Sequence, residues 1–235
     1  MGVWLVTGVQ AAGKTTVADL LARQFDRGVH VRGGQFYRWA VRGWVHPGDE
    51  REAEVRRLLD LRYRLSAMAA AEYSDAGFTV VVQDNIFGAD VVTWLNQVRA
   101  TPRHLVVLRP GADAVRARDA ARQAATGKVA YRPGEFTIEG LDRALGRTPR
   151  FGLWLDTSAQ TAEQTVAEIL RRRHEALIRE DLYPAGRAVL LTEDDAWRRR
   201  AAIDRQNGWL GRADGVFFKV LGSQPMTVRV DLNPG

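Results

Sequence analysis

The sequence has 235 residues, of which 46% are hydrophobic and 26% are charged, so a packed core is expected and an intrinsically disordered chain is excluded. The absence of cysteine excludes a disulfide scaffold, a thiolate metal site and a cysteine nucleophile. No apolar run reaches the roughly 18 residues of a membrane span, and no signal-peptide pattern opens the sequence, so we expect a cytoplasmic protein without a membrane partner. The net charge of +6 fits either a nucleic-acid partner or a polyphosphate ligand.

Short apolar runs alternate with stretches of helical spacing along residues 1–180. This alternation predicts an α/β fold, with a doubly wound parallel sheet of five strands and helices on both of its faces. Strands are expected at residues 3–7, 29–31, 78–82, 105–108 and 151–155. Helices are expected at residues 15–25, 35–42, 50–74, 89–98, 113–125, 138–145 and 161–180.

The last part of the chain, residues 181–235, has a different pattern and carries no chemistry motif. Strands are expected at residues 189–191, 216–221 and 227–230, with a helix at 193–204. We therefore divide the chain into a P-loop domain, residues 1–180, and a β-rich C-terminal extension, residues 181–235. The extension is expected to pack on the domain or on a second subunit, because about 55 residues seldom build a core of their own.

The strongest motif is GVQAAGKT at residues 8–15, which matches G-x-x-x-x-G-K-[ST] and defines a P-loop NTPase. It follows a predicted strand and opens a predicted helix, so backbone N–H groups and the helix dipole can surround phosphate oxygens. Lys14 would reach the β- and γ-phosphates, and Thr15 would offer its hydroxyl to Mg²⁺. The predicted nucleotide-binding residues of this loop are Gly8, Gln10, Ala11, Ala12, Gly13, Lys14, Thr15 and Thr16.

An acid, Asp84, follows the apolar run at residues 78–82. At the carboxyl end of a central strand it would lie where ligands bind in open α/β sheets. In P-loop proteins such an acid holds Mg²⁺ through water or acts as a base, so Asp84 is a catalytic and metal-site candidate beside Thr15. The alternative is an ordinary loop acid or helix N-cap.

Two arginines, Arg118 and Arg122, lie four residues apart on one face of a predicted helix. The glycine-containing stretch 126–134 follows, and we interpret residues 113–134 as a lid that closes over the triphosphate. Both arginines would then be catalytic, because they would neutralise charge in the transition state. The alternative is a solvated helix face paired with neighbouring acids.

The segment after the second strand is rich in aromatic residues, which suits a pocket for a planar or partly apolar acceptor. Trp39 is the one that we assign to the core. The acceptor is expected between this segment and the helix at residues 50–74. The predicted acceptor-binding residues are Arg32, Gln35, Phe36, Tyr37, Trp39 and Asn85.

Residues 1–180 resemble the small P-loop phosphotransferases, in particular the chloramphenicol phosphotransferase family and, more distantly, gluconate and shikimate kinases. The resemblance rests on residues 8–16, on residues 82–88 (VQDNIFG), on Arg109, Arg118 and Arg122, and on residues 155–157 (LDT). It implies a strand order of 2-3-1-4-5, ATP with Mg²⁺ as the phosphate donor, and an adenine site at residues 156–159 that includes Asp156 and Thr157.

One position departs from that family, which places an aspartate just after the second strand to accept the proton of the hydroxyl being phosphorylated. The matching residue here is Gly34, which cannot accept a proton. Asp84, Asp49 and Glu50 are the acids that could substitute. Phosphoryl transfer depends mainly on positioning and electrostatics, so the missing base does not by itself exclude the reaction.

These observations predict an ATP-dependent phosphotransferase that moves the γ-phosphate to a hydroxyl of a small molecule, and the resemblance suggests an antibiotic- or natural-product-like alcohol. A nucleoside or polynucleotide kinase is one alternative, favoured by the basic charge. A non-catalytic nucleotide-dependent binding protein is another, suggested by Gly34. The sequence leaves open the acceptor, the choice between ATP and GTP, and whether the chain forms a homodimer.

Overall fold

The computed structural model describes residues 1–47, 49–131 and 136–179, together with the backbone of residues 186–190 and 228–232. The chain divides into two units, Met1–Arg179 and Glu180–Gly235, and each is described by itself. In the second unit, β7 (Gly186–Leu190) and β8 (Val228–Leu232) form an antiparallel pair. Two of the strands expected there are therefore present with shifted bounds. The strand expected at 216–221 and the helix expected at 193–204 lie outside the described residues.

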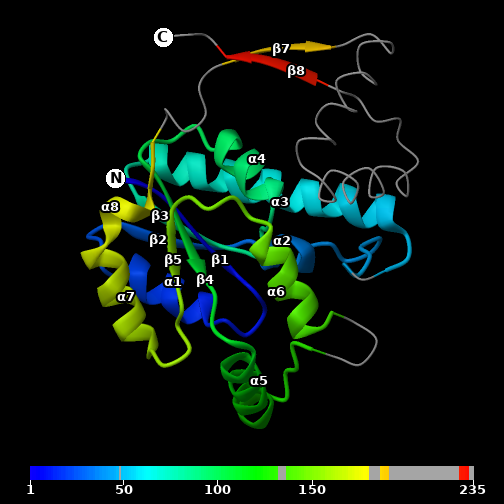
Figure 1. The fold of residues 1–235 in the computed structure, drawn as a ribbon, viewed down its shortest axis with the longest axis vertical. Coiled ribbons are helices and arrows are strands. Elements are labelled where there is room, and N and C mark those ends of the chain that lie inside the picture. Colours follow the sequence, from blue (N-terminus) through cyan, green and yellow to red (C-terminus); the bar gives the residue numbers. More distant parts are fainter. Residues whose placement is uncertain (48, 132–135, 180–185, 191–227, 233–235) are drawn as a thin grey trace, which may run out of the picture. The chain divides into compact units, whose positions relative to one another are not determined.

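The first unit is built on a sheet in which five parallel strands have the order β2-β3-β1-β4-β5 (Figure 1). This confirms the predicted strand order. The strands are β1 (Gly2–Gly8), β2 (Gly28–Arg32), β3 (Thr79–Gln83), β4 (Arg103–Leu108), β5 (Leu153–Leu155) and β6 (Leu177–Ile178). The helices are α1 (Lys14–Ala22), α2 (Gly34–Arg38), α3 (Glu52–Asp75), α4 (Ala89–Gln97), α5 (Ala112–Thr126), α6 (Ile138–Gly146), α7 (Ala162–Arg171) and α8 (Arg173–Ala176).

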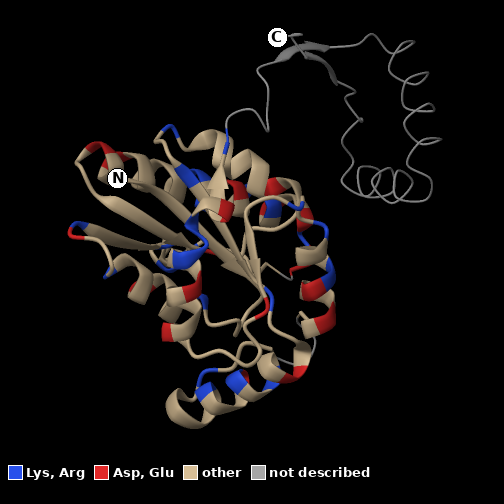
Figure 2. Ribbon diagram, turned by 60° about the vertical axis from the view of Figure 1, so that its left-hand side comes forward, with Lys and Arg blue, Asp and Glu red and all other residues tan. Residues whose placement is uncertain are grey.

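The central strands form the core because they are mostly apolar and are covered by helices on both faces. Every residue of β1 is buried, and Val80, Val81 and Val82 of β3 are fully buried. Neither β1 nor β3 carries a charged residue, and Figure 2 shows that most charged residues lie on helices and loops. The β1 and β3 strands therefore hold the loops at their carboxyl ends in fixed positions.

Two helix layers cover the sheet. Helices α1 and α7 pack against each other on one face, and α3 and α4 pack against each other on the other (Figure 1). Between α3 and α4, the indole N–H of Trp94 donates a hydrogen bond of 2.9 Å to the buried Ser66 hydroxyl. The long α3 also contacts β1, β2 and β3, which brings its side chains close to the carboxyl ends of these strands.

The prediction of one helix over residues 161–180 was wrong for the last part of this range. Helix α7 ends at Arg171, a short α8 follows, and residues 177–178 form β6, which pairs antiparallel with Arg103 and His104 of β4. The reason is tertiary: β5 pairs only with residues 106–108 of β4, so the first part of this edge has free backbone groups that β6 satisfies. The helical spacing of this segment gives no sign that its last residues pair with the uncovered part of β4.

A second correction concerns Trp39, which we expected in the core. The helix predicted at residues 35–42 ends at Arg38, and the Trp39 side chain just beyond it is 70% exposed. Its ring meets Phe36 edge-on at 5.0 Å between centroids. Among the residues that the structure describes, no helix is long and apolar enough to cross a membrane.

Candidate active site

The loop between β1 and α1 has the backbone conformation that a phosphate cradle requires. Gly13 has φ 91° and Ala11 has φ 58°, so both lie in the left-handed region, which is costly for alanine. When right-handed and left-handed backbone conformations alternate along a loop, successive N–H groups point toward one place and form an anion-binding nest. Helix α1 begins at Lys14, so its N-terminal N–H groups and dipole face the same space.

Lys14 is buried in this loop and donates a hydrogen bond of 2.6 Å from Nζ to the carbonyl oxygen of Val9. Burial is the main cause that lowers the pKa of Lys14 to about 7, and the positive charges of Arg62 and Arg122 contribute to this value. The ammonium thus lies at a site suited to an anion. Phosphate oxygens are the groups that would restore its charged form.

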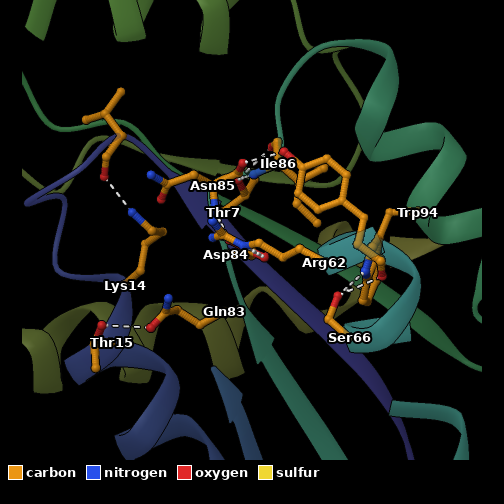
Figure 3. Close-up of polar contacts among 12 residues, drawn as sticks. Thr7, Lys14, Thr15, Arg62, Ser66, Gln83, Asp84, Asn85, Ile86 and Trp94 are labelled. Carbon is orange, nitrogen blue, oxygen red and sulfur yellow. Dashed lines mark hydrogen bonds and ion pairs between the residues drawn. The ribbon is translucent and has the colours of Figure 1, made fainter. Parts of the chain in front are cut away.

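Beside Lys14, the exposed Thr15 hydroxyl donates a hydrogen bond of 2.7 Å to the side-chain oxygen of Gln83 at the end of β3 (Figure 3). A hydroxyl and an amide oxygen are hard oxygen donors, and a phosphate-binding loop beside them would supply the remaining oxygens through a nucleotide. This donor set fits Mg²⁺, which is usually held by few protein groups together with water and phosphate. Sequence analysis identified Thr15 but missed Gln83, although its place directly before Asp84 was a signal.

Asp84 is fully buried and is not among the residues that line the cavity described below. Its carboxylate is occupied by Arg62 of α3, whose Nε donates to Oδ2 at 2.9 Å and whose Nη2 contacts Oδ1, and by the N–H of Asn85 at 2.7 Å (Figure 3). The carboxylate also fills the space beside Gly33, where an added Cβ would lie 2.0 Å from Oδ2. The predicted role of Asp84 in metal binding or proton transfer stays a prediction.

Arg62 is a residue that sequence analysis missed. Its side chain is 12% exposed and its guanidinium lies 4.9 Å from the ring centroid of Tyr37, so it is held between Asp84 and an aromatic face. In the sequence, Arg62 is one of several arginines on a long amphipathic helix. Only the packing of α3 against the sheet brings it to the carboxyl end of β3.

The two predicted lid arginines have different surroundings. Arg118 donates hydrogen bonds to the carbonyl oxygens of Thr157, at 2.5 Å, and Ala12, at 3.3 Å, so it joins the phosphate loop to the loop after β5. Arg122 forms an ion pair with Asp119 at 2.6 Å, and its Nε is buried without a hydrogen-bond partner among the described residues. Within the predicted lid, residues 113–134, Arg118 and Tyr131 contact the phosphate loop, since the Tyr131 hydroxyl donates a hydrogen bond of 2.9 Å to the carbonyl oxygen of Gln10. Residues 132–134 lie outside the described residues.

A cavity of about 820 Å³ joins these groups. Lys14, Arg38, Arg118 and Arg122 contribute four cations to its wall, and none of its described lining residues is an aspartate or a glutamate. The full lining consists of Gln10, Ala11, Ala12, Gly13, Lys14, Thr15, Thr16, Val17, Gly34, Arg38, Gln83, Asn85, Arg118, Arg122, Thr157, Gln160, Thr161, Ala162 and Thr165.

Most of the predicted loop residues therefore meet in one place, and Gly8 lies just outside, at the end of β1. Of the predicted acceptor residues, Asn85 lines the cavity. Five others do not: Arg32 lies 4.0 Å from Asp19, Tyr37 lies under Arg62, and the remaining three are Gln35, Phe36 and Trp39.

The two predicted nucleotide-binding residues that follow β5, Asp156 and Thr157, line different cavities. Thr157 lines the large one, whereas Asp156 lines a second cavity with Arg109 and accepts hydrogen bonds from Ser158. Arg109 is held by Asp142 through two hydrogen bonds of 2.8 Å. The contribution of Asp156 to nucleotide binding stays a prediction.

With this geometry in place, the comparisons with known proteins can be stated. Residues 3–148 match the family described as AAA domain (AAA_33), which is more than half of the chain. The chain belongs to this AAA domain family. A search among curated proteins finds no match.

Solved structures show the same fold at low sequence identity. A sugar kinase from Janibacter sp. HTCC2649 has a TM-score of 0.53 and 19% identity, covering 75% of this chain and 96% of its own. The APS kinase CysC from Mycobacterium tuberculosis, solved in complex with AMPPNP and APS, has a TM-score of 0.53 and 17% identity, covering 74% of this chain and 97% of its own. The AAA domain of this protein thus has the fold of P-loop kinases, as the sequence predicted.

Proposed function

We propose that this protein is an ATP–Mg²⁺-dependent phosphotransferase that acts on a small-molecule acceptor. The observation that supports it most is the cavity that brings together most of the phosphate loop, two arginines from α5, Gly34 at the start of α2 and Gln83 at the end of β3. A phosphate site alone would suit any nucleotide-binding protein. The same cavity also extends to Gly34 and Asn85, which leaves room for a second substrate.

The proposed roles follow from the contacts. Lys14 and the N–H groups of the phosphate loop bind the β- and γ-phosphates. Thr15 and Gln83 would hold Mg²⁺, which when bound neutralises charge on the phosphate oxygens. Arg118 binds the nucleotide by fixing the loop after β5, and Arg122, whose Nε is unpaired, stabilises the phosphoryl group in transit.

Asp84 has a different proposed role from the one that the sequence suggested. Because its two oxygens are engaged by Arg62 and by the backbone of Asn85, it acts as a positioning residue that fixes the carboxyl end of β3. Adenine would lie near Thr157, whose loop Arg118 contacts. ATP is the proposed donor, and GTP is the competitor that a binding experiment has to compare.

The type of acceptor, and whether phosphate is transferred at all, remain to be tested by the experiment described below. An antibiotic- or natural-product-like alcohol is the acceptor that the resemblance suggests, but the described cavity wall offers it no carboxylate to take its proton. The same observation favours, as a second candidate, a protein that binds nucleotide without transferring phosphate. Turnover in the presence of acceptors separates the two.

The experiment compares wild type with Lys14→Ala and with the matched control Arg99→Ala, which removes an exposed cation after α4, near the amino end of β4. Calorimetry with ATP–Mg²⁺ and GTP–Mg²⁺ measures binding, and ADP release with a panel of acceptors measures turnover. We expect Lys14→Ala to reduce turnover on the order of 100-fold or more and Arg99→Ala to leave it unchanged. Binding without acceptor-dependent ADP release would favour the binding protein.

A further inference from the structure

The charged side chains described in the wall of the large cavity all have the same sign. Lys14, Arg38, Arg118 and Arg122 line it, and no described acid does. Arg122 alone of these has a carboxylate partner, Asp119, among the described residues. Arg38, at the end of α2, is exposed and makes no hydrogen bond or ion pair within that part of the chain. A cation left unpaired in a cavity wall is available to a ligand anion.

The acids that could serve as a base are held elsewhere. Asp84 is fully buried under Arg62 and does not reach the cavity. Asp49 does not line it either, and hydrogen bonds from Arg51 lower the pKa of Asp49 to about 2, which makes it a weak base. Glu50 is exposed and also lies outside the lining. A neutral hydroxyl in this cavity would therefore have no described carboxylate to accept its proton.

The position of the missing base is open rather than filled. An added Cβ at Gly34 would have only Arg62 Nη2, at 4.0 Å, as a neighbour, and Gly34 begins α2 without a positive φ. Nothing in the local geometry demands glycine there. The vacant space lies in the same cavity wall as the guanidinium of Arg38, four residues along the same short helix.

We infer that the acceptor attacks with an oxygen that is already ionised, that of a phosphate or carboxylate group, and that Arg38 binds this group. This inference rests on the proposed function. The acceptor oxyanion forms a bond to the γ-phosphorus while the bond between that phosphorus and the β,γ-bridging oxygen breaks, and ADP leaves with the electron pair. No proton is transferred, so the step needs no base, and the cations that line the cavity offset the charge of the two anions.

The test measures ADP formation from ATP–Mg²⁺ with matched acceptors: ribose 5-phosphate against ribose, AMP against adenosine, and acetate against ethanol. Phosphorus NMR of the products identifies the oxygen that was phosphorylated, since a phosphate acceptor gives a P–O–P bond, a carboxylate an acyl phosphate and an alcohol a phosphomonoester. We expect transfer to the ionised group. Comparing the phosphate-containing acceptors with acetate shows whether that group is a phosphate or a carboxylate.

The variant Arg38→Ala probes the recognition of the anion, with Arg99→Ala as the matched control. We expect Arg38→Ala to raise the KM for the ionised acceptor by about 10- to 100-fold, as for loss of a charged hydrogen bond, with the KM for ATP unchanged. Arg38→Lys should recover part of this loss, because it keeps the charge.

Two results overturn the inference. Transfer to the alcohols in preference to every ionised acceptor, or an unchanged acceptor KM in Arg38→Ala, shows that the acceptor is not an anion bound by Arg38, and leaves the proposed phosphotransferase intact. Binding of ATP–Mg²⁺ without transfer to any member of the panel removes the proposed function and this inference together. The two failures are therefore distinguishable.

Discussion

At the scale of single residues, Lys14 links nucleotide binding to a proton. Its pKa is lowered to about 7, and bound phosphates would raise it again by favouring the ammonium. At pH 8 we therefore expect ATP–Mg²⁺ binding to take up close to one proton, and the affinity to fall as the pH rises above about 7. Calorimetry in two buffers of different ionisation enthalpy measures this uptake, and equal heats in both buffers would contradict it.

Alanine substitutions at the adjacent residues Gly33 and Gly34 are expected to have different effects on stability. An added Cβ at Gly33 would lie 2.0 Å from Asp84 Oδ2, whereas one at Gly34 would meet nothing closer than 4.0 Å. Gly33→Ala should displace the Asp84–Arg62 pair and lower stability by about 3 kcal/mol or more, as for a disrupted buried ion pair. Gly34→Ala should leave stability unchanged or raise it slightly. Denaturant unfolding of both variants checks this, and equal destabilisation would show that the two positions are alike.

At the scale of elements, prediction from sequence was reliable where one segment determines its own structure. The phosphate loop and the apolar strands β1, β3 and β4 follow from local patterns, and their predicted order was confirmed. Strand β6 could not be predicted, because its pairing depends on how much of β4 is left uncovered by β5. The exposure of Trp39 was also missed: the helix expected at residues 35–42 ends at Arg38, and Trp39 follows it with its side chain exposed.

The candidate site follows the same division. The residues of the phosphate loop lie together as the motif requires. Arg62 is one of several arginines on the long α3, and Arg38 ends the short α2 in an aromatic segment, so neither stands out in the sequence. Asp84 illustrates why an acid at a strand end is ambiguous. Its neighbour in space, Arg62, decides whether the carboxylate faces a ligand, and that neighbour lies 22 residues away along the chain.

The helix α5 supports a prediction that separates its two arginines. Arg118 already bonds the loop carbonyls of Ala12 and Thr157, so Arg118→Ala should raise the KM for ATP. Arg122→Ala should lower kcat and kcat/KM together, because its unpaired Nε would gain a partner only in the transition state. Steady-state kinetics of both variants measures this. If neither variant changes a kinetic constant, α5 is a solvated helix rather than a lid.

At the scale of the whole molecule, the division of the chain leads to a truncation experiment. The unit Met1–Arg179 contains the complete six-stranded sheet and the hydrophobic core of the described residues. A chain that ends at Arg179 should therefore fold and bind ATP–Mg²⁺ like the full chain. Circular dichroism and calorimetry test this, and an unfolded product would refute it. Loss of acceptor transfer alone would assign residues 180–235 to the acceptor site.

The cation-lined cavity also has a consequence for the rate at which ligands arrive. A concave wall with charges of one sign focuses the field and accelerates the encounter with anions, and mobile ions screen it over a Debye length of about 8 Å at physiological ionic strength. Association of ATP–Mg²⁺ should thus slow steeply as salt is added, while dissociation changes little. Inorganic phosphate or sulfate in a buffer would be attracted by the same field, so the choice of buffer anion should change the rate at which the nucleotide binds.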